Sequence, residues 1–250
     1  MQKFEKLIPY PTNQLTGVVL AGGTSSRLGR DKAELILRED GAPLLVETAR
    51  LLRRVVPKVV ISGRPSNWIG HSRITALPEW PGMANDDFPG LPDDLPGKGP
   101  VGAITTALRH MGTACLILAC DMPLMEERVL RLLLETWSRQ RASANTGAEN
   151  STTKKSAAHK STAQKNTLVT AFAHPENGKL EHLAAIYEPE ALSYLEPSLN
   201  ADLLKIGLVI PQEHYCLIPL PPDMREAFFN INRPADLEAV RRKLGEASLF

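Results

Sequence analysis

The chain has 250 residues, 43 % of them hydrophobic, and a formal net charge of +1. A charge this close to zero gives no overall attraction to nucleic acid or to an anionic membrane, and no apolar run reaches the roughly 20 residues of a membrane span. Residues 1–14 lack the apolar segment of a secretory signal, and the three cysteines form no paired framework. We therefore expect a cytoplasmic protein with neither a nucleic-acid nor a membrane partner.

The first predicted element is a short strand at 17–20, which ends at the glycine pair Gly22-Gly23. Paired glycines let backbone N–H groups approach anionic oxygens closely. In the polar loop that follows, Arg27 can bind a phosphate with two N–H groups and Lys32 adds a compact positive charge. The loop predicts a phosphate site at the end of the first strand. It matches neither the P-loop spacing nor the G-x-G-x-x-G spacing of dinucleotide-binding domains.

Strands and helices alternate along most of the remaining chain. We predict further strands at 58–62, 74–77, 114–120, 168–173, 181–187 and 228–232, and helices at 43–56, 101–111, 126–141 and 234–245. This alternation predicts an α/β fold with a doubly wound, mostly parallel sheet and helices on both faces.

Two segments interrupt the alternation. Residues 78–99 are dense in Pro, Gly and Asp and predict a long surface loop. Residues 138–166 are rich in Ser, Thr, Ala, Lys and Asn and contain almost no large apolar side chains. Such a segment cannot bury enough surface to offset the entropy of ordering it. We therefore expect a single domain over 1–250 with a flexible insertion at about 138–166.

Asp121 directly follows the apolar run that ends at Cys120. In an open parallel sheet, ligands bind at the carboxyl ends of the central strands, and a carboxylate there is a suitable ligand for Mg²⁺ on a triphosphate. An acidic residue before a helix can equally be its N-terminal cap. The residues alone leave both interpretations open.

Four segments resemble motifs of the molybdenum cofactor guanylyltransferase family. The string LAGGTSSRLGRDK at 20–32 resembles L-A-G-G-x-S-x-R-x-G-x-D-K, with Leu28 where the family usually has Met. CDMP at 120–123 resembles the segment that carries the family's metal-binding Asp, and DDLPGKGPVG at 93–102 resembles D-x-x-P-G-x-G-P-L-x-G. FNINRPADL at 229–237 resembles F-N-I-N-T-P-x-D-L, with Arg233 replacing Thr. Ser62 stands where the family has an Asn near the end of the second strand.

The resemblance implies a Rossmann-like nucleotidyltransferase that moves GMP from GTP to molybdopterin, or to the molybdenum cofactor, with Mg²⁺ as cofactor. Molybdoenzymes or their chaperones are further partners that it allows. The implied catalytic residues are Arg27, Lys32 and Asp121, with Asp121 as the metal ligand. The implied nucleotide-binding residues are Leu20, Ala21, Gly22, Gly23, Lys32, Ser62, Asp93, Asp94 and Asp121, and the implied acceptor-binding residues are Asn230 and Asn232.

Two alternatives remain open. One is cytidylyl or other nucleotidyl transfer to a different phosphate acceptor, against which the Gly22-Gly23 pair favours guanine. The other is a nucleotide-binding protein without turnover. The presence of both Lys32 and Asp121 favours catalysis, because binding alone would not require a leaving-group cation together with a metal-binding acid.

Overall fold

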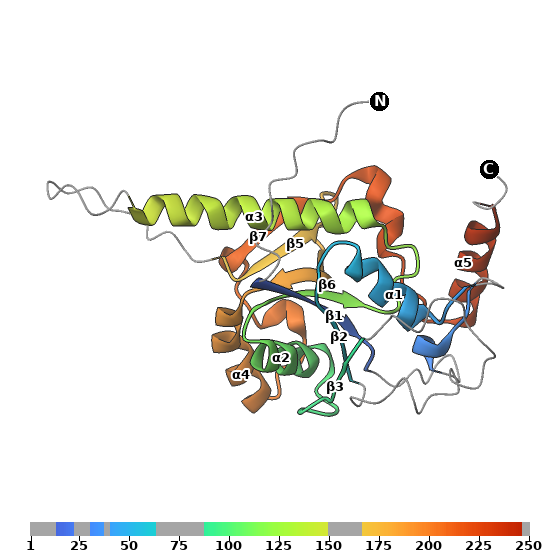
Figure 1. Ribbon diagram of the computed structural model, residues 1–250, viewed down its shortest axis with the longest axis horizontal. Coiled ribbons are helices and arrows are strands. Elements are labelled where there is room, and N and C mark those ends of the chain that lie inside the picture. The colour runs from blue at the N-terminus through green and yellow to red at the C-terminus, as the bar shows by residue number, and fades with distance from the viewer. Residues whose placement is uncertain (1–13, 23–30, 38–40, 64–87, 150–166, 247–250) are drawn as a thin grey trace, which may run out of the picture.

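The computed structural model describes residues 14–22, 31–37, 41–63, 88–149 and 167–246. Within these ranges one sheet of seven strands has the order β3-β2-β1-β4-β6-β5-β7 (Figure 1). The strands are β1 (Leu15–Leu20), β2 (Val59–Ser62), β3 (Gly90–Leu91), β4 (Ala114–Ala119), β5 (Val169–Ala173), β6 (Leu180–Tyr187) and β7 (Tyr215–Pro219). Only β6 is antiparallel to its neighbours, so the sheet is mostly parallel, as predicted.

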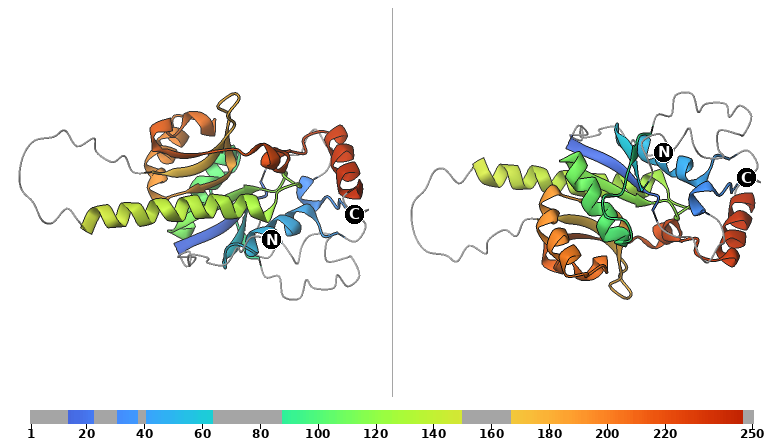
Figure 2. Two further views of the ribbon diagram at one scale, coloured as in Figure 1. Left: turned by 90° about the horizontal axis from the view of Figure 1, so that it is seen from above. Right: turned by 90° about the horizontal axis from the view of Figure 1, so that it is seen from below.

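Helices cover both faces of this sheet, which makes the fold doubly wound as the sequence predicts. The α-helices are α1 (Leu44–Arg53), α2 (Gly99–Met111), α3 (Glu127–Glu149), α4 (Leu192–Asn200) and α5 (Pro234–Glu246). Short 3₁₀ helices occur at Lys32–Glu34, Pro189–Ala191, Ile206–Leu208, Gln212–His214 and Pro222–Phe228. Helices α1 and α3 lie on one face and α2 and α4 on the other (Figures 1 and 2). None of the helices in the described ranges is both long enough and apolar enough to cross a membrane.

The central strands are buried on both sides. In β1, Val19 packs into the cluster under α1 and α3, whereas Val18 and Leu20 pack into the cluster under α2 and α4. Two-sided burial explains why β4 is a continuous apolar run and why the second half of β1, at residues 18–20, is apolar as well. The register places Leu20 beside both Ser62 and Ala119. The carboxyl ends of β1, β2 and β4 therefore finish at one level.

Helix α3 is longer than the sequence indicates. The predicted insertion begins at 138, but α3 continues to Glu149. Ser138 is buried, and the Arg141 guanidinium donates a hydrogen bond of 2.7 Å to Glu188, which follows β6. The boundary at 138 is therefore wrong, because this part of the segment is helical and its first turn packs on the domain. Residues 150–166 lie outside the described ranges.

Three other predictions need correction or completion. Residues 229–232 form no strand, because the Ile231 N–H donates to the carbonyl oxygen of Asp121 and the Asn232 N–H to the Asp236 carboxylate. The sequence does not predict helix α4 and strand β7, because each contains a proline, which disguises its pattern. It does not predict the two-residue strand β3 either, which lies inside the predicted loop at 78–99. The predicted strand at 74–77 lies outside the described ranges, as do residues 78–87 of the predicted loop.

Candidate functional site

The carboxyl ends of β1, β2 and β4 lead into a cavity of about 680 Å³, here called the central cavity. Residues 20–22 after β1, Gly63 after β2 and residues 119–121 after β4 line one side of it. The first turn of α2, at Gly99 and Pro100, also lines it, and so does Lys32, whose side chain is partly exposed. The cavity thus lies where ligands bind in open α/β sheets.

Gly22 and Gly63, which both line the central cavity, lie in close contact. Gly63 has a φ of +85°, and a Cβ atom there would lie 2.9 Å from both Cα and N of Gly22. A side chain at Gly63 would therefore collide with the backbone after β1. The two glycines leave main chain rather than side chains exposed toward a ligand, which favours the binding of phosphate. Gly22 belongs to the glycine-rich motif, whereas Gly63 belongs to none of the motifs; its signal is its place one residue beyond β2.

Lys32, Asp121 and Asn232 meet at the rim of the central cavity. Lys32 is held on a 3₁₀ helix that Asp31 caps, with the Asp31 carboxylate accepting from the Ala33 N–H at 3.0 Å. Its ammonium donates to the amide oxygen of Asn232 at 2.8 Å and lies 3.4 Å from a carboxylate oxygen of Asp121. The Lys32 and Asp121 side chains are 18 % and 23 % exposed, so a ligand in the cavity can reach both.

The second carboxylate oxygen of Asp121, Oδ1, is buried and accepts no hydrogen bond within the described part of the chain. A buried carboxylate oxygen without a donor is unfavourable unless a cation or donor satisfies it. Asp121 also lies well before the first residue of α3, Glu127, and so does not cap that helix. These observations favour the ligand-binding interpretation of Asp121 over the capping one.

The described residues hold no group of three or more His, Cys, Asp or Glu side chains arranged for a metal. A site built only from protein ligands, as for structural zinc, does not occur among them. Mg²⁺ in phosphate-transfer sites takes one or two carboxylates and completes its shell with phosphate oxygens and water. Asp121, with its unsatisfied oxygen, fits that pattern.

The other implied site residues lie in different places. Leu20, Ala21 and Gly22 line the central cavity. Ser62, Asp93, Asp94 and Asn230 do not: Ser62 is buried in β2, and Asn230 donates to the carbonyl of Phe228. Gly23 and Arg27 lie outside the described ranges.

The two aspartates of the 93–102 segment contact α2 away from its first turn. Asp93 accepts from the Leu95 N–H at 3.0 Å and from the Thr106 hydroxyl at 3.4 Å, and Asp94 pairs with His110 at 2.8 Å. From the same segment, Gly97, Gly99 and Pro100 reach the central cavity, and the two glycines have positive φ. Their P-G-x-G-P spacing is the signal that identifies them.

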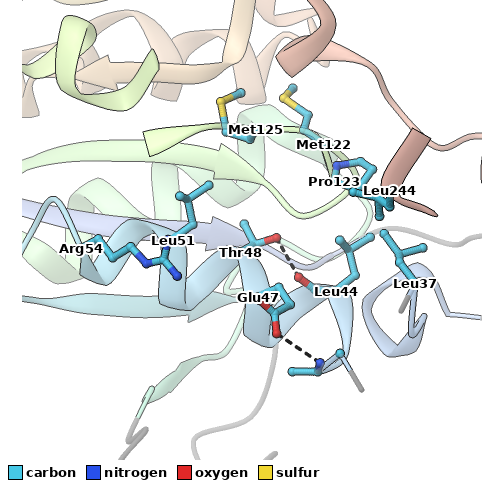
Figure 3. A pocket seen from close by; sticks show the side chains of 12 residues that line it. Leu37, Leu44, Glu47, Thr48, Leu51, Arg54, Met122, Pro123, Met125 and Leu244 are labelled. Carbon is cyan, nitrogen blue, oxygen red and sulfur yellow. Dashed lines mark hydrogen bonds between the residues drawn. The ribbon is translucent and has the colours of Figure 1, made fainter. Parts of the chain in front are cut away.

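A second cavity, of about 380 Å³, lies behind the turn that follows Asp121 (Figure 3). One stripe of α1 forms its floor, and Met122 and Met125 lie above that stripe in Figure 3. Two polar side chains in its wall are already engaged: Thr48 donates to the Leu44 carbonyl at 2.7 Å, and Glu47 accepts from the Ala42 N–H at 3.1 Å. Arg54 adds a guanidinium to this wall, and the other lining residues are glycine, proline or apolar.

Known proteins resemble this chain in sequence and in fold. A protein named "Probable molybdenum cofactor guanylyltransferase" from Methanothermobacter thermautotrophicus is 29 % identical over 88 % of this chain and 95 % of its own length. A protein of the same name from Pyrococcus furiosus is 28 % identical over 92 % and 98 %. The crystal structure of molybdopterin-guanine dinucleotide biosynthesis protein A from Archaeoglobus fulgidus superposes with a TM-score of 0.62, at 20 % identity, covering 92 % of this chain and 99 % of that one. At that identity the structural likeness shows the fold alone.

The sequence of residues 17–201 matches the family described as "MobA-like NTP transferase domain". The matched region holds the glycine-rich loop, Lys32, Asp121 and the first turn of α2, and it spans well over half of the chain. The family indicated by the sequence motifs is thereby confirmed: the chain belongs to the MobA-like NTP transferase family.

Proposed function

We propose that the protein is a Mg²⁺-dependent guanylyltransferase that transfers GMP from GTP to molybdopterin, or to its molybdenum-containing form, and releases pyrophosphate. The observation that carries the proposal is the placement of Lys32 beside Asp121 at the rim of the central cavity. The family supports nucleotidyl transfer. The names of the relatives support guanine and the molybdenum cofactor as the substrates.

The triphosphate would lie between the glycine backbone after β1 and the first turn of α2. The N-cap residue Lys98 makes no side-chain cap, so the N–H groups of Gly99 and Val101 and the positive end of the helix dipole can interact with phosphate oxygens; Pro100 has no N–H to contribute. A cavity of about 680 Å³ is in the size range of nucleotide-sized ligands. From the loop beyond Gly22, we assign Gly23 and Arg27 to the same phosphates, on their motif positions.

In the reaction, an oxygen of the acceptor phosphate attacks the α-phosphorus of GTP. The bond between the α-phosphorus and the bridging oxygen breaks, and that oxygen leaves with pyrophosphate. No protein nucleophile is required, so the protein contributes positioning and charge stabilisation. Lys32 would stabilise the charge that gathers on the departing pyrophosphate.

Asp121 would hold Mg²⁺ through its unsatisfied oxygen. When bound, the ion would offset the negative charge of the phosphates during the transfer. Asn232 is a neutral partner for Lys32, and it orients the ammonium without cancelling its charge. Lys32 would therefore keep Asn232 as a hydrogen-bond acceptor while the Asp121 carboxylate binds Mg²⁺.

A direct test is to incubate the purified protein with Mg²⁺ and each labelled nucleoside triphosphate, with and without molybdopterin, and to measure pyrophosphate and the dinucleotide product. We expect product with GTP and molybdopterin together. Lys32→Ala should lose this product. Its matched control is Lys243→Ala, because Lys243 lies on α5 and makes an exposed pair with Glu226 of the 3₁₀ helix Pro222–Phe228. If product forms from CTP instead, the activity is cytidylyl transfer rather than guanylyl transfer. If nucleotides bind without any turnover, the protein is a nucleotide-binding protein rather than an enzyme.

A further inference from the structure

The first turn of α5 holds an acidic residue, Asp236, that points back along the chain. Its carboxylate accepts hydrogen bonds from the backbone N–H groups of Asn232 and Arg233, each at 2.8 Å. Between them and Asp236, Pro234 occupies the first position of the helix, where a missing N–H costs nothing. The N–H groups of Asn232 and, next, of Arg233 lower the pKa of Asp236, so the carboxylate is ionised at neutral pH. It is the acidic half of a helix-capping arrangement.

The backbone segment that Asp236 holds, at residues 231–233, also contacts the catalytic pair Lys32 and Asp121. The Ile231 N–H donates to the carbonyl oxygen of Asp121 at 2.9 Å, and the Asn232 amide oxygen accepts from the Lys32 ammonium. Asn232 is thus fixed at two points, its N–H on Asp236 and its side chain on Lys32. A loss of the first contact releases the backbone from which the second one is made.

Helix α5 itself is attached to the segment that carries Lys32. Leu237 and Val240 of α5 pack with Ile231, Leu35 and Leu44 in a small cluster separate from the two clusters of the sheet. The Arg241 guanidinium donates to the Ile36 carbonyl at 3.3 Å. Figure 1 shows α5 at the end of the molecule, beside this segment and away from the sheet. Asp236 and Lys32 therefore belong to one locally packed unit.

We propose that Asp236 is a positioning residue for the catalytic pair and acts through Asn232. The inference rests on the proposed function, since nucleotidyl transfer is the reaction that this positioning serves. With Asp236 in place, the Asn232 amide holds the Lys32 ammonium toward the central cavity. Without it, the ammonium shifts toward the Asp121 carboxylate, which lies only 3.4 Å away. The two charges then neutralise each other, and Lys32 competes with Mg²⁺ for Asp121.

The test is a double-mutant cycle of Asp236→Ala and Asn232→Ala, read in kcat, in KM for the nucleotide and in the Mg²⁺ concentration for half-maximal rate. Displacement of a positioning contact lowers kcat by roughly tenfold or more. We expect Asp236→Ala to lower kcat to that extent and to raise the Mg²⁺ requirement, with a smaller change in KM. In the Asn232→Ala background it should add almost nothing, because the two residues act as one unit. Glu238→Ala, an exposed change on the same helix, is the control and should match wild type.

Asp236→Asn is a second variant for the case in which Asp236→Ala does not fold. Its amide oxygen still accepts from both N–H groups, so it should recover most of kcat. Losses that multiply in the double variant, or an unchanged kcat and Mg²⁺ requirement in Asp236→Ala, would overturn the proposal. Where Asp236→Ala does not fold, Asp236→Asn replaces it in the cycle: the neutral amide accepts more weakly than the carboxylate, so a small loss of kcat is expected that vanishes in the Asn232→Ala background. A loss that persists in that background, or no loss at all, would then overturn the proposal. The cycle is also read in the Kd of Mg²⁺–GTP by calorimetry. If the wild-type protein binds the nucleotide but does not turn it over, the proposed function is refuted. The Kd values then still test Asp236: non-additive values in the cycle support its role, and additive values refute it.

Discussion

Lys32 and Asn232 are 200 positions apart in the sequence, and the Lys32 ammonium donates a hydrogen bond of 2.8 Å to the Asn232 amide oxygen. Asp121 joins them from the end of β4. Three segments, from the first loop, the middle of the sheet and the start of α5, thus meet at one point. Because each contributes one polar group, the geometry of the site depends on the docking of α5 as well as on the sheet.

The contact between Gly22 and Gly63 predicts a strong effect of Gly63→Ala. The added Cβ would lie 2.9 Å from the Gly22 backbone, and the φ of +85° is itself strained for alanine. The control is Gly112→Ala, at a φ of +61° with no atom within 4 Å of the new Cβ. The strain alone costs about 1–2 kcal/mol, so we expect that loss for Gly112→Ala and a larger one for Gly63→Ala. Urea denaturation measures both.

Nucleotide titration of the same variants separates the site from the fold. Gly63→Ala should weaken nucleotide binding, whereas Gly112→Ala, which ends α2 far from its first turn, should not. Equal losses of stability in the two variants, together with unchanged nucleotide affinity in both, would show that the contact between the glycines has no role.

Two nearby arginines of α3, Arg141 and Arg139, should differ in their contribution to the free energy of unfolding. Arg141 donates to Glu188, whose side chain is only 13 % exposed, and its guanidinium lies 5.1 Å from the ring centre of Trp137. Arg139 makes a surface pair with Glu135 at 3.4 Å. We expect Arg141→Ala to cost about 1–2 kcal/mol of unfolding free energy and Arg139→Ala less than about 0.5 kcal/mol. Similar values for the two would mean that α3 is not anchored at Arg141.

His182 predicts a loss of stability on acidification. Burial lowers the pKa of His182 below its usual value, although the neighbouring Glu181 opposes the shift. The unfolded chain, with a His pKa of about 6.5, then takes up the proton at a higher pH than the folded protein does. The contribution of His182 to the free energy of unfolding is therefore full above about pH 6.5. It is lost as the pH falls from about 6.5 toward the lower pKa of the folded state.

The check is the melting temperature of wild type and of His182→Gln between about pH 7.5 and pH 5. The wild-type melting temperature should fall more steeply on acidification than that of the variant, which cannot take up the proton. Parallel curves would mean that His182 does not contribute to the pH dependence.

Local patterns were sufficient to predict the central strands and two of the three rim residues. The buried apolar runs predicted β1 and β4 correctly, and Lys32 and Asp121 line the cavity at the carboxyl ends of these strands, where their positions in the sequence place them. The residues alone left the role of Asp121 open between ligand binding and helix capping. The position of Asn232 came from a family motif, and its contact with Lys32 could not be predicted from spacing, since it depends on how α5 docks.

The wrong predictions, a strand at 228–232 and the start of the insertion at 138, concern segments that lie partly or wholly away from the sheet. Residues 229–232 alternate like a strand, but Ile231 is buried against α5 and α1 rather than in the sheet. The end of α3 lacks an apolar stripe because this part of the helix extends beyond the strands, as Figure 2 shows. It therefore has no sheet to pack against. In both places the surroundings, rather than the local sequence, decide which pattern is required.

The most direct test of the central claim compares Lys32→Ala and Asp121→Asn in a Mg²⁺ titration of nucleotidyl transfer. Groups that stabilise developing charge contribute roughly 10²-fold or more to turnover, and we expect both variants to lose that much at ordinary Mg²⁺. Raised Mg²⁺ should partly restore Asp121→Asn, because concentration compensates for a weakened metal site, and should do little for Lys32→Ala. Normal turnover of Asp121→Asn at ordinary Mg²⁺ would contradict the assignment of Asp121 as the metal-binding residue of this site.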